Sequence, residues 1–298
     1  MVTHSGIEAF LTICRSKSIT QAAEALFVSQ SSLSVRLKAL ENELSTTLFQ
    51  RKKGQREIVL TKSGREFYEI ALEYEKVMNR IEKMRREHYK KLCISSINSL
   101  GAYILPESYE RFMEKYPDVG LVIRDQELGE ACKSILQGRT DLAFNTGYNV
   151  PETITAMPVF SEKCTFICSK NSTYPEVVSP DMLNVKNEVY VEWDRSFDRF
   201  HASVFGDNSP QLRLDIMSQL RIFVEKPNHW AIVPISVARG LEQIADIQQR
   251  KASFALPKRT VYCLHSSESD LEEQSIHFLK CLKETLFQKK EVDCLLDI

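Results

Sequence analysis

The chain has 298 residues, of which 43% are hydrophobic and 27% charged, and its formal net charge is -1. This length and composition exclude a disordered chain or a small disulfide-stabilised protein and favour two or three globular domains. No uncharged stretch reaches the roughly 20 apolar residues of a membrane helix, and the N-terminus lacks the features of a secretory signal. We therefore expect a cytoplasmic protein with no membrane partner, whose eight cysteines are reduced thiols.

The charge is distributed unevenly along the chain. Residues 1–91 contain 17 Lys and Arg against 11 Asp and Glu, a net charge of +6, whereas residues 92–298 carry a net charge of -7. A basic N-terminal part on an acidic body favours a polyanionic partner such as nucleic acid. The alternative is a basic surface that is simply solvated.

Three helices are predicted in the first 45 residues. Apolar residues at i, i+3, i+4 and i+7 from Ile7 predict the first helix, Thr20 is expected to cap a second of two turns, and Ser29 a third. The third helix carries one stripe of leucines at positions 33, 37, 40 and 44. Two short helices followed by a longer one are typical of a helix-turn-helix, in which the last helix enters the major groove of duplex DNA.

The helix periodicity also predicts which residues of the third helix face outward. Ser31, Val35, Lys38 and Asn42 lie opposite the leucines, while Gln30 and Ser34 lie near the N-terminal end, where a helix-turn-helix contacts base edges. A valine that faces water contributes no burial energy to the fold, but its methyl groups suit contact with a thymine methyl. The alternative is a tolerated surface valine.

Two further segments complete the N-terminal part. A basic turn at residues 51–56, before a short strand at 58–60, predicts a wing that meets phosphates or enters a minor groove, with a solvated basic loop as the alternative. Ser63 and Glu66 fit a capping box at the start of a long helix that reaches Lys91. Apolar residues in that helix repeat at heptad spacing and predict a dimer interface, which would be formed by Phe67, Ile70, Tyr74, Val77, Ile81 and Met84. The alternative is that this face of the helix packs on its own domain.

A set of residues through the first 64 positions keeps the spacing of a known protein family, except in the wing, where the stretch from Arg51 to Gly64 is about two residues longer than usual. They are Phe10-Leu11, 18–23, Leu26, 28–30, Leu33-Ser34, Leu40-Glu41, Leu44, Leu48-Phe49, Arg51, Leu60-Thr61 and Gly64. This pattern resembles the LysR-type family of bacterial transcriptional regulators. The resemblance implies DNA contacts by Gln30, Ser31, Ser32, Ser34, Val35 and Arg36, and by Arg51, Lys53 and Arg56 of the wing. Val35 stands where the family often has Arg, so the base sequence that is read does not carry over.

The remaining 200 residues alternate strand-like and helix-like segments, which predicts α/β lobes with a mainly parallel sheet. Leu105-Pro106, Phe112, Tyr116-Pro117, Gly138 and 141–143 resemble the effector domain of the same family, whose fold is similar to that of periplasmic binding proteins. The expected fold class is thus α/β with an N-terminal all-α winged helix-turn-helix, a long linker helix and a two-lobed effector domain. The expected domains are 1–60, the linker 61–91, a first lobe of 92–161 and 266–298, and a second lobe of 162–265, with crossings near Ser161 and Ser266.

Ligands of open α/β sheets bind beyond the carboxyl ends of the strands. The strand ends here predict an effector site formed by Asn98, Ser99, Gln126, Glu127, Asn145, Thr146, Trp193 and Met217. The neutral groups suit a small polar or aromatic ligand, and Glu127 would repel a carboxylate unless an Arg or a helix N-terminus intervened. The alternative is a small acid, a frequent class of effector in the family that the chain resembles. Each residue could instead be a cap, a turn or part of the core.

The expected function is a sequence-specific DNA-binding transcriptional regulator whose DNA binding or bending is modulated by a small-molecule effector bound between the two α/β lobes. Its expected partners are double-stranded DNA, an effector and its own copy as a homodimer or homotetramer, with RNA polymerase as a further partner. No enzyme motif, metal-ligand cluster or cofactor motif is recognised. The alternatives are a solute-binding protein without a DNA role and a thiol-based redox regulator using Cys164 and Cys168. On one strand these residues would stand about 13 Å apart, which is too far for a disulfide.

Overall fold

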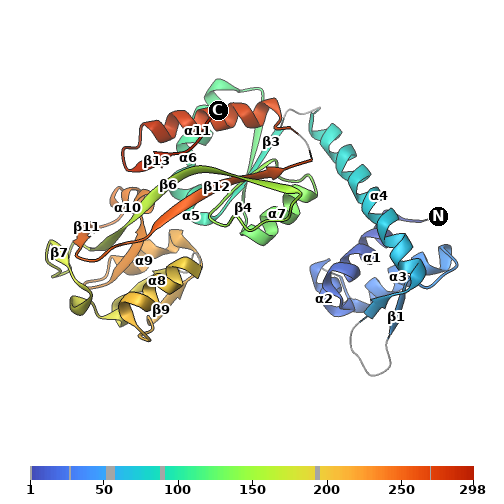
Figure 1. Ribbon diagram of the computed structural model, residues 1–298, viewed down its shortest axis with the longest axis horizontal. Coiled ribbons are helices and arrows are strands. Elements are labelled where there is room, and N and C mark those ends of the chain that lie inside the picture. Colours follow the sequence, from blue (N-terminus) through green and yellow to red (C-terminus); the bar gives the residue numbers. More distant parts are fainter. Residues whose placement is uncertain (1, 27, 52–57, 88–90, 192–194, 269) are drawn as a thin grey trace. The chain divides into compact units, whose positions relative to one another are not determined.

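The computed structural model describes residues 2–26, 28–51, 58–87, 91–191, 195–268 and 270–298. The chain divides into two compact units, residues 1–84 and 85–298, and each is described by itself. Both are drawn in Figure 1.

The N-terminal unit is a helix-turn-helix followed by a two-stranded hairpin and a long helix. Its core is formed by the inner faces of the first three helices and the start of the fourth, with Phe10 in contact with Phe49 and Phe67. Its elements are α1 (His4–Ser16), α2 (Ile19–Ala25), α3 (Gln30–Glu43), β1 (Phe49–Arg51), β2 (Ile58–Leu60) and α4 (Lys62–Glu87).

Two helix starts differ from those expected. Ser18, not Thr20, caps α2, because its hydroxyl accepts a hydrogen bond from the backbone N–H of Gln21. The Ser63–Glu66 capping box was also a wrong prediction. Thr61 fills this role for α4, since its hydroxyl accepts from the N–H of Gly64 and donates to the Thr47 carbonyl.

Gly64 marks the place where α4 packs against the preceding segment. A Cβ at this position would lie 2.0 Å from the backbone oxygen of Leu48, a distance that no side chain tolerates. The Leu48 carbonyl also accepts a hydrogen bond from the N–H of Thr61. Only glycine therefore lets α4 start this close to the hairpin.

The C-terminal unit contains a nine-stranded sheet, a separate two-stranded sheet and surrounding helices. Its strands are β3 (Lys91–Ser96), β4 (Gly120–Asp125), β5 (Leu142–Asn145), β6 (Ile154–Ser169), β7 (Val177–Val178), β8 (Val189–Val191), β9 (Leu212–Leu214), β10 (Trp230–Pro234), β11 (Ile247–Ala252), β12 (Lys258–Ser266) and β13 (Val292–Cys294). Its helices are α5 (Asn98–Tyr103), α6 (Pro106–Lys115), α7 (Leu128–Leu136), α8 (Arg195–Phe205), α9 (Leu220–Val224), α10 (Ile235–Glu242) and α11 (Glu273–Phe287), with short 3-10 helices at Pro180–Met182, Val185–Asn187 and Met217–Gln219.

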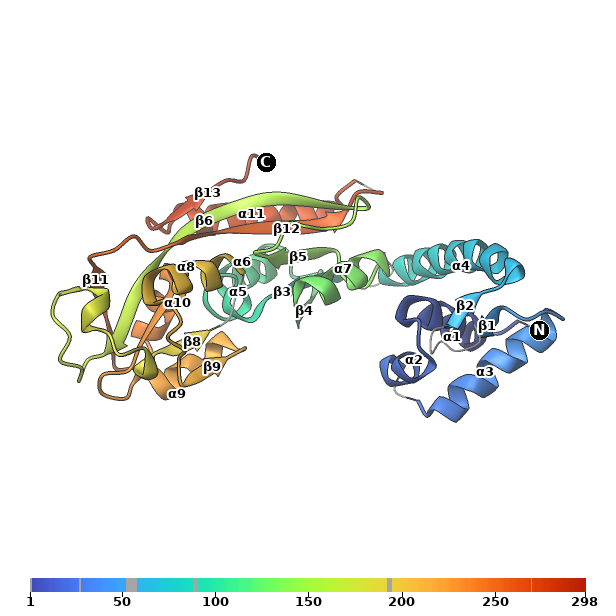
Figure 2. The same cartoon turned by 60° about the horizontal axis from the view of Figure 1, so that its bottom comes forward.

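The large sheet is mixed, not mainly parallel as expected. Its strand order is β4-β3-β5-β12-β6-β11-β7, and β10 and β13 also pair with β6. β3 is parallel to β4 and β5, but β6 is antiparallel to β10, β11, β12 and β13. The reason is that β6 and β12, which lie side by side in Figure 2, form a long antiparallel ribbon. Antiparallel strands pair directly, whereas parallel strands would need a helical crossover between them.

This ribbon joins two lobes, each with its own core. In the first lobe α6 and α11 cover one face of the sheet and α7 the other, whereas β8 to β10, α9 and α10 enclose a core of the second lobe. β12 already pairs with β5 at Tyr262, Cys263 and Leu264. The chain therefore returns to the first lobe before Ser266, which is earlier than the expected crossing, because the returning strand itself belongs to the first-lobe sheet.

Candidate functional site

The third helix presents a polar face on the N-terminal unit. Leu33, Leu37 and Leu40 are buried with exposed fractions of 0%, 8% and 3%. The opposite side exposes most of the residues expected to contact DNA, with Arg36 half-buried; the exposed ones are Gln30, Ser31, Ser32, Ser34 and Val35. The leucine stripe thus fixes the rotation of α3 and leaves this polar face in solvent.

Serine hydroxyls at the start of α3 form a local hydrogen-bond network. The hydroxyl of Ser29 accepts from the N–H of Ser32 and donates to the hydroxyl of Ser32 at 2.8 Å. It also lies 2.9 Å from the hydroxyl of Ser31, and the hydroxyl of Ser34 donates to the Gln30 carbonyl at 2.9 Å. These bonds hold the first turn of the helix in a defined conformation.

The stem of the expected wing is the antiparallel pair β1–β2, in which Phe49 pairs with Leu60 and Arg51 with Ile58. Lys53 and Arg56 lie outside the described residues, as does the side chain of Arg51. The two paired strands flank the basic turn in the sequence, as the stem of a hairpin wing would.

The apolar seam of α4 divides into two sets. Phe67 is buried at 9% exposure and Tyr74 packs against the same core, with its hydroxyl 3.4 Å from the ring of His4. Ile70, Val77 and Ile81 instead are 59%, 50% and 44% exposed. The side chain of Met84 lies outside the described residues. Within the described part of α4, the packing on its own domain thus accounts for two of the seam residues and leaves three as an exposed apolar stripe.

The expected effector residues of the first lobe lie at one edge of its sheet. β3, β4 and β5 run parallel, so their carboxyl ends meet there. The side chain of Asn98 joins two segments, since its N–H donates to Asp125 at 3.1 Å and its oxygen accepts from the backbone N–H of Ser218 at 3.0 Å. Asn98 therefore links this edge to the 3-10 helix that follows β9 in the second lobe.

Several expected effector residues are engaged in the fold. Gln126 is buried and bonds Ser134 and Thr140, and Met217 is part of the second-lobe core. Trp193 lies outside the described residues. The side-chain oxygen of Asn145 accepts from the N–H of Gly147, whereas its buried side-chain nitrogen has no hydrogen-bond partner. Glu127 and Thr146, in contrast, retain solvent exposure.

The electrostatic environment of Glu127 is acidic. Burial, followed by repulsion from Asp125 and Asp215, raises the pKa of its carboxyl group. Asp215 follows β9, so acidic groups from both lobes act on one side chain. A carboxylate ligand placed here would meet the same repulsion.

A buried charge network at the lobe junction was not predicted from the sequence. Arg259 on β12 and Glu162 on β6 are register partners with fully buried side chains, and the guanidinium Nε donates to Glu162 Oε1 at 2.8 Å. Ser99 accepts from Arg259 Nη1 at 2.9 Å, and Ser236 at the start of α10 donates its backbone N–H to Glu162 Oε2 at 2.9 Å. The sequence did contain one indication of this network: on a strand, Glu162 shares a face with the apolar residues Phe160 and Cys164, which places a carboxylate on a buried face.

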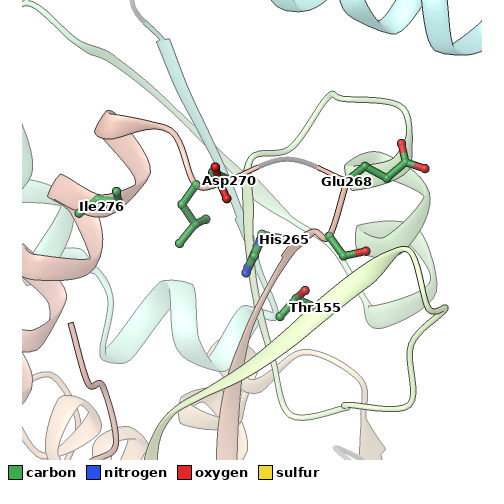
Figure 3. Close-up of a pocket in the computed structure, with 7 residues that line it drawn as sticks. Thr155, His265, Glu268, Asp270 and Ile276 are labelled. Atoms are coloured by element: carbon green, nitrogen blue, oxygen red, sulfur yellow. The ribbon is translucent and has the colours of Figure 1, made fainter.

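A cavity of about 600 Å³ opens elsewhere on the first lobe. Figure 3 shows the side chains around it, which come from the ends of β6 and β12, the following loop and α11: Thr155, His265, Ser267, Glu268, Asp270, Leu271 and Ile276. None of these is an expected effector residue. Because β12 is antiparallel to β5, the cavity lies toward the amino end of β5 and not toward the carboxyl edge.

The cysteines offer little support for redox chemistry. None of the eight forms a disulfide in the described part of the chain. Cys164 and Cys168 are buried in one core cluster, and burial raises the pKa of the Cys168 thiol. Burial also raises the pKa of Cys14 to about 12. A raised pKa disfavours the reactive thiolate.

Two negative findings concern the described residues. No helix among them is long and apolar enough to cross a membrane. No group of three or more His, Cys, Asp or Glu side chains among them is arranged to hold a metal ion.

Comparisons with known proteins agree with the fold of both units. The HTH-type transcriptional regulator CzcR of Bacillus subtilis (strain 168) is 30% identical over 187 residues, covering 61% of this chain and 63% of that protein. The chain thus spans less than two thirds of the length of the curated relatives it matches first. Two solved structures share the fold: a full-length OxyR variant from Pseudomonas aeruginosa, with a TM-score of 0.61 and 19% identity over 95% of both chains, and full-length CbnR in complex with its target DNA, with a TM-score of 0.51 and 18% identity over 94% of this chain and 98% of that one.

Two segments that together make up most of the chain match domains of one family. Residues 5–65 match the bacterial regulatory helix-turn-helix protein of the LysR family, and residues 85–287 match the LysR substrate binding domain. The expected family and two-lobed fold class are therefore confirmed. The chain belongs to the LysR family of bacterial helix-turn-helix regulators.

Proposed function

We propose that the protein is a sequence-specific DNA-binding transcriptional regulator of the cytoplasm. The observation that carries the proposal is the exposed polar face of α3, which lies within residues 1–91, the segment whose net charge is +6. A helix with this exposure fits the major groove, and basic side chains around it neutralise phosphates. The related CbnR is a DNA-bound neighbour of the same fold.

Replacing Gln30 with Ala is expected to weaken specific binding by about 1 to 3 kcal/mol, because a glutamine amide can form two hydrogen bonds with adenine. The measurement is fluorescence anisotropy of the full chain with a duplex recovered by selection from a random pool. Asn42→Ala, an exposed change near the other end of α3, is the matched control and should leave affinity unchanged. If no sequence is enriched from the pool, the proposed function is wrong.

We further propose that a small polar ligand at the carboxyl edge of the first-lobe strands modulates DNA binding. The support is the edge formed by Asn98, Glu127, Asn145 and Thr146, including the buried side-chain nitrogen of Asn145 that lacks a partner. Arg259, the buried cation near this edge, is already neutralised by Glu162. With acidic groups around Glu127, the favoured ligand is neutral or cationic and not a carboxylate.

A thermal-shift screen of the full chain against a metabolite library tests the location of this ligand. A compound bound at the strand edge should raise the melting temperature of the wild type, and Thr146→Ala should reduce that shift. Ser267→Ala, in the separate cavity shown in Figure 3, is the matched control and should leave the shift intact. The reverse pattern would place the ligand in the cavity and contradict the strand-edge site.

We also propose that the exposed stripe of α4, Ile70, Val77 and Ile81, forms a homodimer interface. Exposing three large apolar side chains on one helix face to water is unfavourable, whereas the same side chains can pack in an interface between two helices. A dimer presents two recognition helices to a two-fold related DNA site. Assembly into a tetramer and contact with RNA polymerase are further proposals that rest on the family alone.

A further inference from the structure

Val35 is an exposed apolar residue in the middle of the polar face of α3. Its exposed fraction is 67%, whereas Leu33 and Leu37, two positions before and after it, are 0% and 8% exposed. Two helix positions correspond to a rotation of about 200°, so Val35 points away from the core that holds α3. No packing role in the described N-terminal unit accounts for its methyl groups.

The neighbours of Val35 on the helix surface are mostly small. Positions three and four residues away are Ser31, Ser32, Lys38 and Ala39, all of them exposed. Three of these side chains are too short to cover the valine. A flat partner can therefore reach the valine methyl groups directly, and the branched side chain is held in few rotamers.

The hydroxyl protons of Ser31 and Ser34, which flank Val35, are committed within the helix. Ser29 has one hydroxyl proton and donates it to Ser32, so Ser31 is the donor in its 2.9 Å bond with Ser29. Ser34 donates its proton to the Gln30 carbonyl. Ser31 and Ser34 thus offer mainly acceptor oxygens to a partner, and the valine supplies apolar contact between them.

On the basis of the proposed function, we propose that Val35 reads the C5-methyl group of a thymine in the major groove. That methyl is the apolar group that the base edges of this groove present, and it distinguishes thymine from cytosine. The net charge of +6 on residues 1–91 favours duplex DNA as the occupant of this face. Val35 is then a specificity-determining residue at a base pair that Gln30 does not read.

The test removes the methyl from DNA and the valine from the protein in turn. A duplex recovered by the full chain from a random pool is synthesised with each thymine replaced singly by deoxyuridine, which lacks only the methyl group. Wild-type affinity should fall about fourfold at one thymine of each half-site, the factor that corresponds to about 0.8 kcal/mol for one buried carbon group. Val35→Ala should reduce this difference between the thymine and uracil duplexes, because its shorter side chain leaves only one methyl group, farther from the base edge.

Two controls separate a methyl contact from other effects. Lys38→Ala, one turn along the same face, should weaken both duplexes by the same factor, because a phosphate contact does not sense the methyl. Thermal unfolding should be unchanged in Val35→Ala, since the side chain is exposed. The proposal is overturned if deoxyuridine has no effect at any position, or if the full fourfold effect persists in Val35→Ala. Failure of the pool to yield any preferred sequence would instead overturn the proposed function.

Discussion

Replacing both Ile70 and Val77 with Asp is expected to convert the proposed dimer to monomers without unfolding the N-terminal unit. The two side chains are 59% and 50% exposed within one chain, so charges there are solvated in the monomer. In a dimer the same charges are buried in an apolar seam, and two per chain should weaken association by at least about a hundredfold, or some 3 kcal/mol. Sedimentation velocity over a range of concentrations measures the change.

Two further variants serve as controls for charge on the helix surface and for unfolding of the unit. Glu69→Lys alters charge on the same helix, about 100° around from Ile70, and should leave the oligomeric state unchanged. Phe67→Asp places a charge in the core beside Phe10, where the rings lie 5.0 Å apart, and should unfold the unit. An unaltered dimer in the double-Asp variant would assign the interface to another surface.

The parts of the fold that the sequence predicted best are those in which local periodicity decides burial. The leucine stripe of α3 follows from apolar spacing alone, and the structure buries Leu33, Leu37 and Leu40, with Leu44 half-buried against the same core. The heptad seam of α4 was correctly recognised as apolar. Its division into a buried and an exposed set depends on which side of α4 meets α1, which is a tertiary property.

The errors arose where distant segments compete with local signals. Ser63 and Glu66 form a plausible capping box, but Thr61 is also hydrogen-bonded to Thr47 and Leu48, so the contact with the preceding segment sets the start of α4. The strand pattern likewise did not show that β6 runs for 16 residues through both lobes. The pairing of Glu162 with Arg259, 97 positions apart, has no local signature. Ser99, which stays a predicted effector contact, also belongs to this network, since its hydroxyl accepts a bond from Arg259.

Glu162→Gln is expected to lower the free energy of unfolding of the C-terminal unit by about 3 to 5 kcal/mol. Removing the carboxylate leaves the fully buried guanidinium of Arg259 without a counter-charge, which costs far more than the loss of one hydrogen bond. The chain has two tryptophans, Trp193 and Trp230, and both lie in this unit. Tryptophan fluorescence during urea denaturation therefore reports its unfolding separately from the N-terminal unit.

The double variant Glu162→Leu with Arg259→Met distinguishes charge desolvation from loss of packing. Replacing both charges with apolar side chains removes the unpaired charge and should recover most of the stability lost in Glu162→Gln, because buried ion pairs seldom exceed their own desolvation cost. Asp246→Asn is the matched surface control: its partner Lys170 lies 3.4 Å away, their side chains are 79% and 55% exposed, and the expected change is below about 0.5 kcal/mol. If the double variant is as unstable as the single one, the network contributes through its shape and its bonds to Ser99 and Ser236, and the desolvation argument is wrong.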